Sequence, residues 1–311
     1  MNNDRIAGKL YLVGAFSLAG TSVVAARYVS NQLGVFTITA VSMAFALMLL
    51  IPISFQKLKA LRGTVSLHQI LPIVIEAFFG MFLFRFLLLN GVSRTSALEA
   101  GILTGATPAI TAFLAWAVLR ESVGVRALIG ILSTIFGVLL VQGLTKVGSG
   151  ISQAHLVGNL LVVGAAASES IFNIVCRTSV IKKANTGKPL DPIVQTTLVT
   201  AAALLLCLVP ALFEQPIERL SQLDGVAWLS LLWYGFFVTA LAYLCWYAGI
   251  KRSGAFTAAA FTGLMPLTSM LLSTFLLREQ TDLYQWLGGA CVIAGMILIG
   301  TRRKDNQTVS L

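Results

Sequence analysis

The chain alternates long apolar stretches with short polar segments. Ten stretches of about 20 residues carry few charges, and this is the length that an α-helix needs to cross the hydrocarbon core of a bilayer. Such stretches are expected to be helical, because no water inside lipid can pair free backbone groups. The predicted transmembrane helices are residues 10–29, 35–55, 70–89, 95–119, 125–142, 157–180, 193–213, 226–250, 255–277 and 283–301.

The second half of the chain repeats the first. Residues 91–140 recur without a gap as residues 249–298, always 158 positions later. The fronts of the two halves match more faintly at a spacing of 150. We therefore predict two repeats, residues 1–150 and 151–311. The matched positions include Gly91/Gly249, Arg94/Arg252, Pro108/Pro266, Leu119-Arg120-Glu121/Leu277-Arg278-Glu279, Gly130/Gly288, Gly137/Gly295, and, at the shorter spacing, Gly8/Gly158, Gly14/Gly164 and Arg27/Arg177.

Each predicted repeat has five helices, an odd number, so the two copies must enter the membrane from opposite sides. They are then inverted about an axis in the membrane plane. The basic residues give an independent orientation. Of the 22 lysines and arginines, fifteen fall in segments on the side of the amino terminus. Only Arg94, Lys146, Arg219 and Arg278 fall in segments on the other side. Both termini are therefore predicted to face the cytoplasm.

Composition excludes several other classes of protein. Hydrophobic residues make up 57% of the chain, charged residues 11%, and the mean hydropathy is +0.87. No polar segment is long enough to bury a soluble core. The four cysteines lie in apolar stretches, the two histidines lie apart, and no metal, cofactor or hydrolase motif is present. The net charge of +10 is scattered over short loops, so we interpret it as a topology signal and not as a nucleic-acid surface. The chain is not expected to be an enzyme.

Ten helices in two inverted fives, with a Leu-Arg-Glu triplet closing each fourth helix, a proline about a dozen residues earlier and a glycine-rich fifth helix, form a pattern with a known counterpart. It resembles the drug/metabolite transporter superfamily and, within it, the EamA-type family. The resemblance implies an all-α polytopic transporter with a cavity between the halves, very often an exporter of amino acids or related metabolites in the bacterial inner membrane. Two departures, Ala19-Gly20-Thr21 in place of a Trp-Gly pair and Glu169 in place of an aromatic residue, argue against transferring a particular substrate.

Residues that occur in one repeat only are the candidates for specificity and coupling. A charged side chain inside the membrane costs about 2.5–3.5 kcal/mol on insertion scales, so it is expected to face the bundle interior and to have a partner or a function. Four positions carry a charge in one repeat and an uncharged residue in the other: Glu76 against Tyr234, Arg85 against Tyr243, Glu99 against Thr257, and Glu169 against Ala19.

Two interpretations of these charges follow. Arg85 and Glu99 lie at similar depth on consecutive antiparallel helices, so an ion pair is predicted, either purely structural or in contact with the solute. Glu169, Asn173 and Arg177 follow each other at four-residue spacing and form a polar stripe on an apolar helix. With Glu76 at comparable depth, this stripe is either satisfied internally or forms a site for a substrate amine or a proton.

The remaining candidates concern the cavity wall and helix bending. Tyr234 and Tyr243 belong to an aromatic-rich eighth helix that could line a cavity for a cationic or partly apolar solute. Pro108 and Pro266 each remove a backbone hydrogen bond inside an apolar helix, so they are either packing kinks or flexing points for gating. The glycines of helices 5 and 10 predict close helix contact, within the protomer or in a homodimer.

These observations predict a secondary transporter that exports a small polar or zwitterionic metabolite by alternating access, in exchange for protons. Its partners are the solute, the lipid bilayer and the coupling proton; no cofactor, metal or nucleic acid is expected, and the protein is a monomer or a homodimer. The alternatives are an importer, a nucleotide-sugar-type exchanger of the same fold, and a membrane scaffold or receptor that transports nothing.

Overall fold

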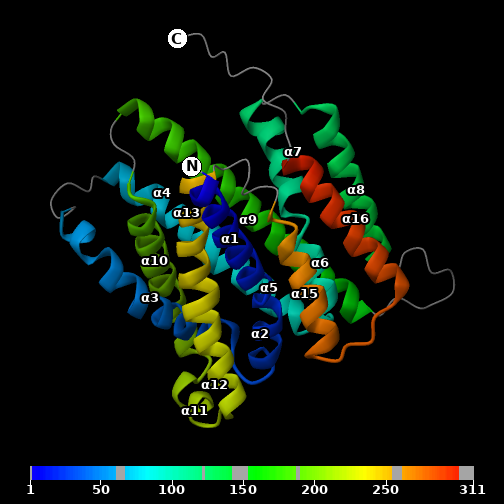
Figure 1. Ribbon diagram of the computed structural model, residues 1–311. Coiled ribbons are helices and arrows are strands. Elements are labelled where there is room, and N and C mark those ends of the chain that lie inside the picture. Colours follow the sequence, from blue (N-terminus) through cyan, green and yellow to red (C-terminus); the bar gives the residue numbers. More distant parts are fainter. Residues whose placement is uncertain are drawn as a thin grey trace.

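The computed structural model describes residues 2–60, 67–120, 123–141, 153–186, 190–253 and 261–300, and these residues form helices and no strands (Figure 1). The first five membrane helices (TM1–TM5) are α1 (Asn2–Gly20) with α2 (Ser22–Val29); α3 (Val35–Ala60); α4 (Leu67–Ala77), η1 (Phe78–Leu83) and α5 (Phe84–Val92); α6 (Ala97–Thr104) with α7 (Thr107–Leu119); and α8 (Val125–Val141).

The second five (TM6–TM10) follow the same plan. They are α9 (Gln153–Thr186); α10 (Pro192–Leu212); α12 (Gly225–Leu232), η2 (Trp233–Leu241) and α13 (Ala242–Ser253); α15 (Leu264–Phe275); and α16 (Leu283–Gly300), with the short α11 (Pro216–Ser221) before α12. Eight helical stretches of the described chain are long and apolar enough to span a bilayer, and α8 and α15 are shorter apolar helices at the two remaining positions. The predicted all-α, ten-helix polytopic fold is confirmed.

The two repeats pack as inverted copies. TM5 pairs with TM10, TM2 pairs with TM7, and the TM1–TM8 contact has its counterpart in the contact of TM3 with TM6. In Figure 1, α8 and α16 flank one side of the bundle, α3 and α10 the other, and α1, α13, α5 and α9 lie between them. The first described residue of α1 and the last of α16 lie at the same end of the bundle, as an even number of crossings requires.

Glycines set the closest of these contacts. A Cβ on Gly137 would lie 2.5 Å from the carbonyl oxygen of Gly288, and one on Gly130 would lie 2.7 Å from that of Gly295. The reciprocal approaches, Gly288 on Gly137 and Gly295 on Gly130, are equally close at 2.7 and 2.6 Å. Each glycine thus contacts the repeat equivalent of the other glycine on its own helix, as expected on a pseudo-two-fold axis. The glycine face predicted from sequence is buried between α8 and α16 within one protomer.

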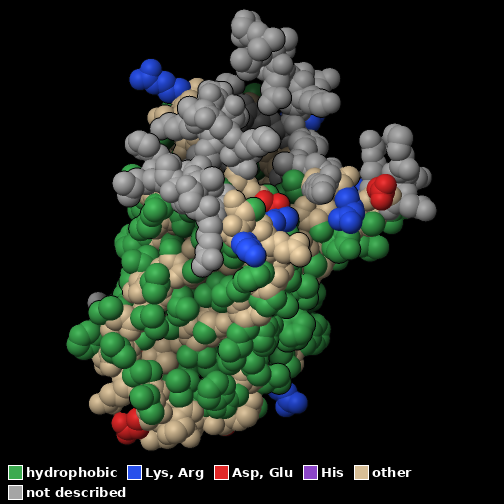
Figure 2. Space-filling model, turned by 90° about the vertical axis from the view of Figure 1, so that its left-hand side faces the viewer, with side chains coloured by type: hydrophobic (Ala, Val, Ile, Leu, Met, Phe, Trp, Pro, Cys, Tyr) green, Lys and Arg blue, Asp and Glu red, His purple; other side chains and the backbone are tan. Residues whose placement is uncertain are grey.

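The outer surface has the character of a lipid-facing surface. Apolar side chains such as Phe213, Phe275 and Val125 are 85%, 76% and 74% exposed. In the face that Figure 2 shows, apolar side chains cover the middle of the molecule, and the visible charged side chains lie toward its two ends. A surface this apolar would aggregate in water and is stable against acyl chains.

Carboxylates cap the helix starts near the ends of the bundle. Both oxygens of Glu279 accept hydrogen bonds from the first backbone N–H groups of α6, at Ala97 (2.8 Å) and Leu98 (2.9 Å). Glu214 does the same for α3 at Phe36 and Thr37. Each carboxylate satisfies donors that have no partner in the helix and complements the positive end of the helix dipole.

This capping gives the Leu-Arg-Glu triplet at the end of TM9 a structural role. The described hydrogen bonds of the Glu279 carboxylate are with the start of α6, in the other repeat. Arg278 adopts φ 52°, a left-handed conformation that turns the chain at the end of TM9, and Arg120 has φ 55° at the equivalent place. The triplet therefore ends one helix and caps another. Glu121 lies outside the described residues.

TM3 and TM8 both contain π-helical turns at equivalent positions. η1 covers Phe78–Leu83, whose equivalents at a spacing of 158 lie inside η2, Trp233–Leu241. Thr239 reinforces the wider turn, because its hydroxyl donates to the carbonyl of Tyr234 five residues earlier (2.8 Å). π-Helical turns are rare and concentrate at functional sites. Here one lies between Glu76 and Arg85, and the other contains Tyr234 and ends just before Tyr243.

Candidate functional site

Arg85 is buried in the interior of the bundle, with 6% of its surface exposed. Its Nη1 donates to Ser42 of α3 (2.6 Å), and its Nη2 donates to Thr239 of η2 (2.5 Å). The guanidinium carbon lies 4.2 Å above the ring centroid of Tyr234. Hydroxyl oxygens and an aromatic face therefore solvate this cation where lipid cannot.

Glu169 lies midway along α9 and is only partly buried. Its Oε2 accepts a hydrogen bond from the hydroxyl of Thr107 on α7 (2.8 Å). Among the described residues, it forms no ion pair. Tyr243 of α13 is an electrostatic neighbour of Glu169, and also of Arg85 and Tyr247. The structure thus places Glu169, Arg85 and Tyr243, three of the predicted site residues, around one intramembrane region.

Asn173 lies one turn beyond Glu169 on α9 and is partly buried. The side chain of Arg177, the third member of the predicted stripe, lies outside the described part of the chain. The stripe is therefore described at its first two positions, Glu169 and Asn173, and both side chains are partly exposed.

Glu76, on α4, is 1% exposed. Its Oε2 accepts a hydrogen bond from Nε2 of Gln195 on α10 (2.7 Å). One residue further along α10, the hydroxyl of Thr196 lies 3.4 Å from the phenol of Tyr247, which also has Glu76 as an electrostatic neighbour. Glu76 therefore lies in the same interior as Glu169 and Arg85, but it is enclosed by α10.

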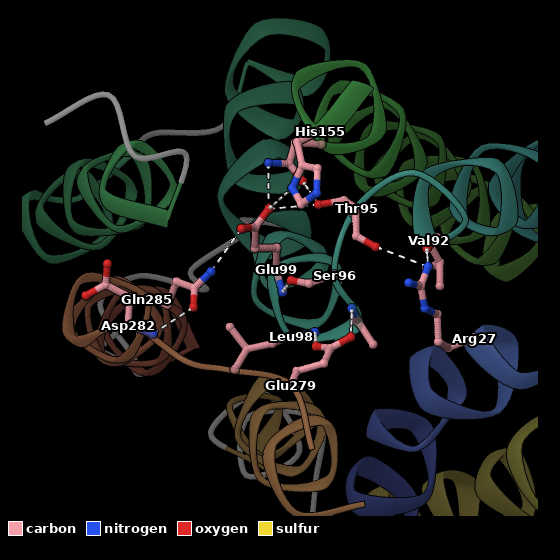
Figure 3. A network of polar contacts seen from close by, with 12 residues as sticks. Arg27, Val92, Thr95, Ser96, Leu98, Glu99, His155, Glu279, Asp282 and Gln285 are labelled. Atoms are coloured by element: carbon pink, nitrogen blue, oxygen red, sulfur yellow. Dashed lines mark hydrogen bonds and ion pairs between the residues drawn. The ribbon is translucent and has the colours of Figure 1, made fainter. Parts of the chain in front are cut away.

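Glu99 belongs to a separate polar network, shown in Figure 3. Its carboxylate accepts hydrogen bonds from Thr95 (2.7 Å), Asn159 (2.9 Å) and Gln285 (2.9 Å), and Nδ1 of His155 lies 3.9 Å away. The same glutamate donates its backbone N–H to Ser96, the N-cap of α6 (3.0 Å). Neutral donors from α9 and α16, and no arginine of the described chain, surround this carboxylate.

The predicted ion pair between Arg85 and Glu99 is therefore wrong. Arg85 lies about two turns before the end of α5, and Glu99 lies in the first turn of α6. Their side chains also point to different helices: Arg85 faces α3 and η2, whereas Glu99 faces α9 and α16. The π-helical turn before Arg85 contributes to this difference, because the extra residue in such a turn rotates the following side chains by about 100°.

We expect Arg85→Met and Glu99→Gln to act independently on folding. Each removes a different set of hydrogen bonds, so the losses of thermal stability in the two single variants should add in the double variant. Denaturation of purified protein in detergent, followed by tryptophan fluorescence, measures all three. If the double variant loses markedly less stability than the sum of the two single losses, the two side chains interact directly, which would support the ion pair and contradict the separate networks.

A cavity of about 590 Å³ opens near this second network. Arg27, Arg94, His155 and Glu279 line it, together with Ser93, Thr95, Ser96 and Gln280. Arg27 is held in place because its Nη1 donates to the carbonyl oxygen of Val92 (2.6 Å). The cavity lies at the end of the bundle where TM3 joins TM4, away from Glu169.

Sequence reasoning missed the small hydroxyl and amide residues that complete the central region: Ser42, Thr107, Gln195 and Thr239. Isolated serine and threonine residues are common in membrane helices and produce no periodic signal. One available clue was the position of Thr107 directly before Pro108, where a helix lacks a backbone donor. In the described chain, no group of three or more His, Cys, Asp or Glu side chains could hold a metal ion.

Comparison with known proteins matches the whole architecture. The EamA-like transporter family matches residues 6–143 and, a second time, residues 156–301. The protein named "Uncharacterized transporter YetK" of Bacillus subtilis is 29% identical over 295 residues, covering 94% of this chain and 87% of that protein. "Uncharacterized transporter YyaM" of the same organism is 28% identical over 259 residues, covering 82% of this chain and 80% of that protein.

A solved crystal structure has the same fold. It aligns over 94% of this chain and 95% of its own length, with a TM-score of 0.58 and 17% sequence identity. At that identity, the likeness concerns the arrangement of helices alone.

Proposed function

Because the chain belongs to the EamA-like transporter family, we propose that it is a secondary active transporter that exports a small polar or zwitterionic metabolite, an amino acid or a related compound, in exchange for protons. Transport proceeds by alternating access, with Glu169 as the carboxylate that gains and loses the coupling proton. Its site of action is the cell inner membrane, with both termini in the cytoplasm.

The position of Glu169 carries this proposal. A carboxylate in the middle of a membrane helix, partly accessible and bonded by one threonine hydroxyl, is costly to maintain for structure alone. The other repeat does without it, since Ala19 occupies the equivalent position. A lone carboxylate can bind either a proton or the ammonium group of a solute, and competition between the two gives exchange. Glu76 is less suited, because α10 encloses it.

The charges of the central region around Glu169 favour a solute without a large negative charge. A nucleotide-sugar-type exchanger needs cavity-facing cations for its phosphates. Arg85 is buried, and Ser42, Thr239 and the Tyr234 ring already engage its guanidinium. Tyr243 is a partly exposed neighbour of Glu169, and Tyr247 is in turn a neighbour of Tyr243; both are phenols, which suit ammonium and apolar groups.

A transport assay with two stages tests the proposal. Expression in a sensitive bacterium against panels of amino acids, amines and toxic analogues identifies compounds whose toxicity the protein lowers. Proteoliposomes that contain a pH-sensitive dye are then exposed to each such compound. Exchange is supported if protons cross the membrane in the direction opposite to that of the compound. Compound movement without proton movement contradicts the coupling, and no movement of any tested compound favours the scaffold alternative. Net uptake along a physiological proton gradient favours an importer.

The proposed orientation predicts a labelling pattern in intact cells. Single cysteines at Ser149, Gln222 and Ser310, in a background without the four native cysteines, are treated with a membrane-impermeant maleimide. Residues 149 and 222 should be labelled and residue 310 should not, because fifteen basic residues hold the opposite side in the cytoplasm. Permeabilised cells, in which all three should react, provide the control. Labelling of residue 310 alone would show that the orientation in the membrane is the opposite of the proposed one.

A further inference from the structure

TM4 is interrupted beside Glu169. Helix α6 ends at Thr104 and α7 begins at Thr107. Across the interruption the hydrogen bonds tighten to three-residue spacing, from Gly105 N to the carbonyl of Ile102 (2.9 Å) and from Ala106 N to that of Leu103 (3.0 Å). A regular helix would then bond the Thr104 carbonyl to the backbone N–H four residues later. That residue is Pro108, which has none.

The hydroxyl of Thr107 has two acceptors within reach. One is the Thr104 carbonyl that Pro108 leaves without a donor, at 2.9 Å, and the other is Oε2 of Glu169, at 2.8 Å. A hydroxyl has a single proton to donate. When Glu169 is ionised, the Thr107 hydroxyl donates its proton to the hydrogen bond with the carboxylate, because hydrogen bonds to a charged acceptor are the stronger ones. The Thr104 carbonyl then loses its donor.

Protonation of Glu169 reverses the direction of this bond. The neutral carboxyl group donates its own O–H to Oγ1 of Thr107, and the Thr107 proton turns to the Thr104 carbonyl. One proton taken from water at Glu169 therefore closes the open hydrogen bond at the interruption of TM4, and its release opens that bond again. No other bond has to form or break.

We propose that Thr107 is the positioning residue that couples the protonation of Glu169 to the conformation of TM4. This inference rests on the proposed function, because it takes Glu169 as the exchanging carboxylate. A second contact ties the same point to α9, since the Ser170 hydroxyl lies within hydrogen-bond distance of the Thr107 carbonyl (3.0 Å) as well as of the Ala166 carbonyl on its own helix (2.7 Å). A change in the bend of TM4 is thus transmitted against TM6 at the level where the proton binds.

The second repeat lacks this device. The equivalent of Thr107 is Met265, directly before Pro266, and the equivalent of Glu169 is Ala19. There, Gly20 packs so closely on the Met265 carbonyl that a Cβ would lie 2.5 Å from the oxygen. In both repeats, a residue of the neighbouring helix thus lies against the carbonyl that precedes the proline. Among the described residues, a carboxylate that can respond to a proton lies beside this point in TM4 and not in TM9.

Thr107 donates the hydrogen bond described for the Glu169 side chain, whereas the charged and titratable groups on the neighbouring helices have other partners. Of the helices packed on α9, α4 carries Glu76, α5 carries Arg85 and α6 carries Glu99, and the preceding sections assign hydrogen bonds to each of them. The described segments η1 and α7 carry no ionisable side chain. Tyr243 and Tyr247 of α13 and Cys176 of α9 are further described groups that interact electrostatically in this region.

Infrared titration of the purified protein in lipid nanodiscs tests the proposal without a solute. The carboxylic acid band that disappears in Glu169→Gln reports protonation of Glu169. In Thr107→Val, which removes the hydroxyl and keeps the shape, the midpoint of this band should move to higher pH by about one unit, because the charged form loses its donor. Thr107→Ser should retain the wild-type midpoint. Thr107→Ala is a second variant without a hydroxyl.

Thr111→Val is the matched control. This hydroxyl lies one turn further along α7, is buried, and has no hydrogen-bond partner among the described residues. Its removal tests for a general effect of deleting a hydroxyl from TM4, and the midpoint should stay at the wild-type value. An unchanged midpoint in Thr107→Val overturns the coupling. A wild-type protein with no band that depends on Glu169 between about pH 4 and pH 9 instead overturns the proposed function.

A second measurement tests whether the conformation of TM4 changes with the protonation of Glu169. Spin labels at Ser93 and Val118 lie on either side of the interruption, about 40 Å apart at 1.5 Å per residue. Their distance distribution, measured by pulsed electron paramagnetic resonance, should change with pH in the otherwise wild-type and Thr111→Val proteins. It should be independent of pH in Thr107→Val and in Glu169→Gln. A pH response that persists in Thr107→Val contradicts the role of the hydroxyl.

Discussion

Replacement of Glu169 by glutamine is expected to reduce transport driven by a pH gradient to the level of protein-free liposomes. Glutamine keeps the shape of the side chain, and its amide oxygen can still accept the hydrogen bond from Thr107. What it cannot do is ionise. Expression and thermal stability should therefore remain near the wild-type values, so the loss would concern coupling alone.

Solute counterflow separates coupling from binding in the same variant. Counterflow exchanges labelled for unlabelled solute and does not require net movement of a proton, so a protein that still binds and reorients should retain it. Glu218→Gln, which neutralises an exposed carboxylate on α11, is the matched control and should leave both activities unchanged. Normal pH-driven transport in Glu169→Gln would transfer the assignment to Glu76 or indicate a uniporter.

The all-α fold and the order of its helices could be predicted from the sequence because each rests on a one-dimensional signal, whereas the orientation of the termini remains a prediction. Apolar length predicts the spans, the repeat predicts the inversion, and the repeated glycines predict the packing of α8 on α16. The two repeat units, residues 1–150 and 151–311, remain a prediction about boundaries.

The candidate site could be predicted only in part. A charge in an apolar helix is conspicuous in any sequence, so Glu76, Arg85, Glu99 and Glu169 were all identified. Their pairing was not predictable, because it depends on the direction in which each side chain points around its helix. The π-helical turns in TM3 and TM8 change that direction without leaving a sequence signature.

The conformational role of the prolines also depends on partners that the sequence does not reveal. Pro108 and Pro266 look equivalent in the repeat, and each follows an interruption of its helix. Only the three-dimensional structure shows that a threonine hydroxyl beside Pro108 is shared with a carboxylate on another helix. Their use as gating points remains a prediction, and the shared Thr107 hydroxyl is the feature on which our proposal of a chemical trigger at Pro108 rests.

Addition of a single methyl group at Gly137 is expected to destabilise the whole protein. A Cβ there would lie 2.5 Å from the Gly288 carbonyl and 2.9 Å from Val292, both on α16, so neither backbone can yield without separating the helix pair. Overpacking of this kind typically costs about 1–3 kcal/mol. Gly137→Ala should therefore lower the melting temperature and the yield of monodisperse protein in detergent.

The matched control is Gly14→Ala in α1, where an added Cβ would meet nothing within 4 Å. Alanine favours a helix more than glycine does, so this variant should be as stable as the wild type or more so. The contrast between two identical substitutions isolates the helix contact from helix propensity. Equal melting temperatures for Gly137→Ala and Gly14→Ala would show that α8 and α16 do not pack this closely, and would remove the contact on which the pseudo-two-fold arrangement of the fifth and tenth helices depends.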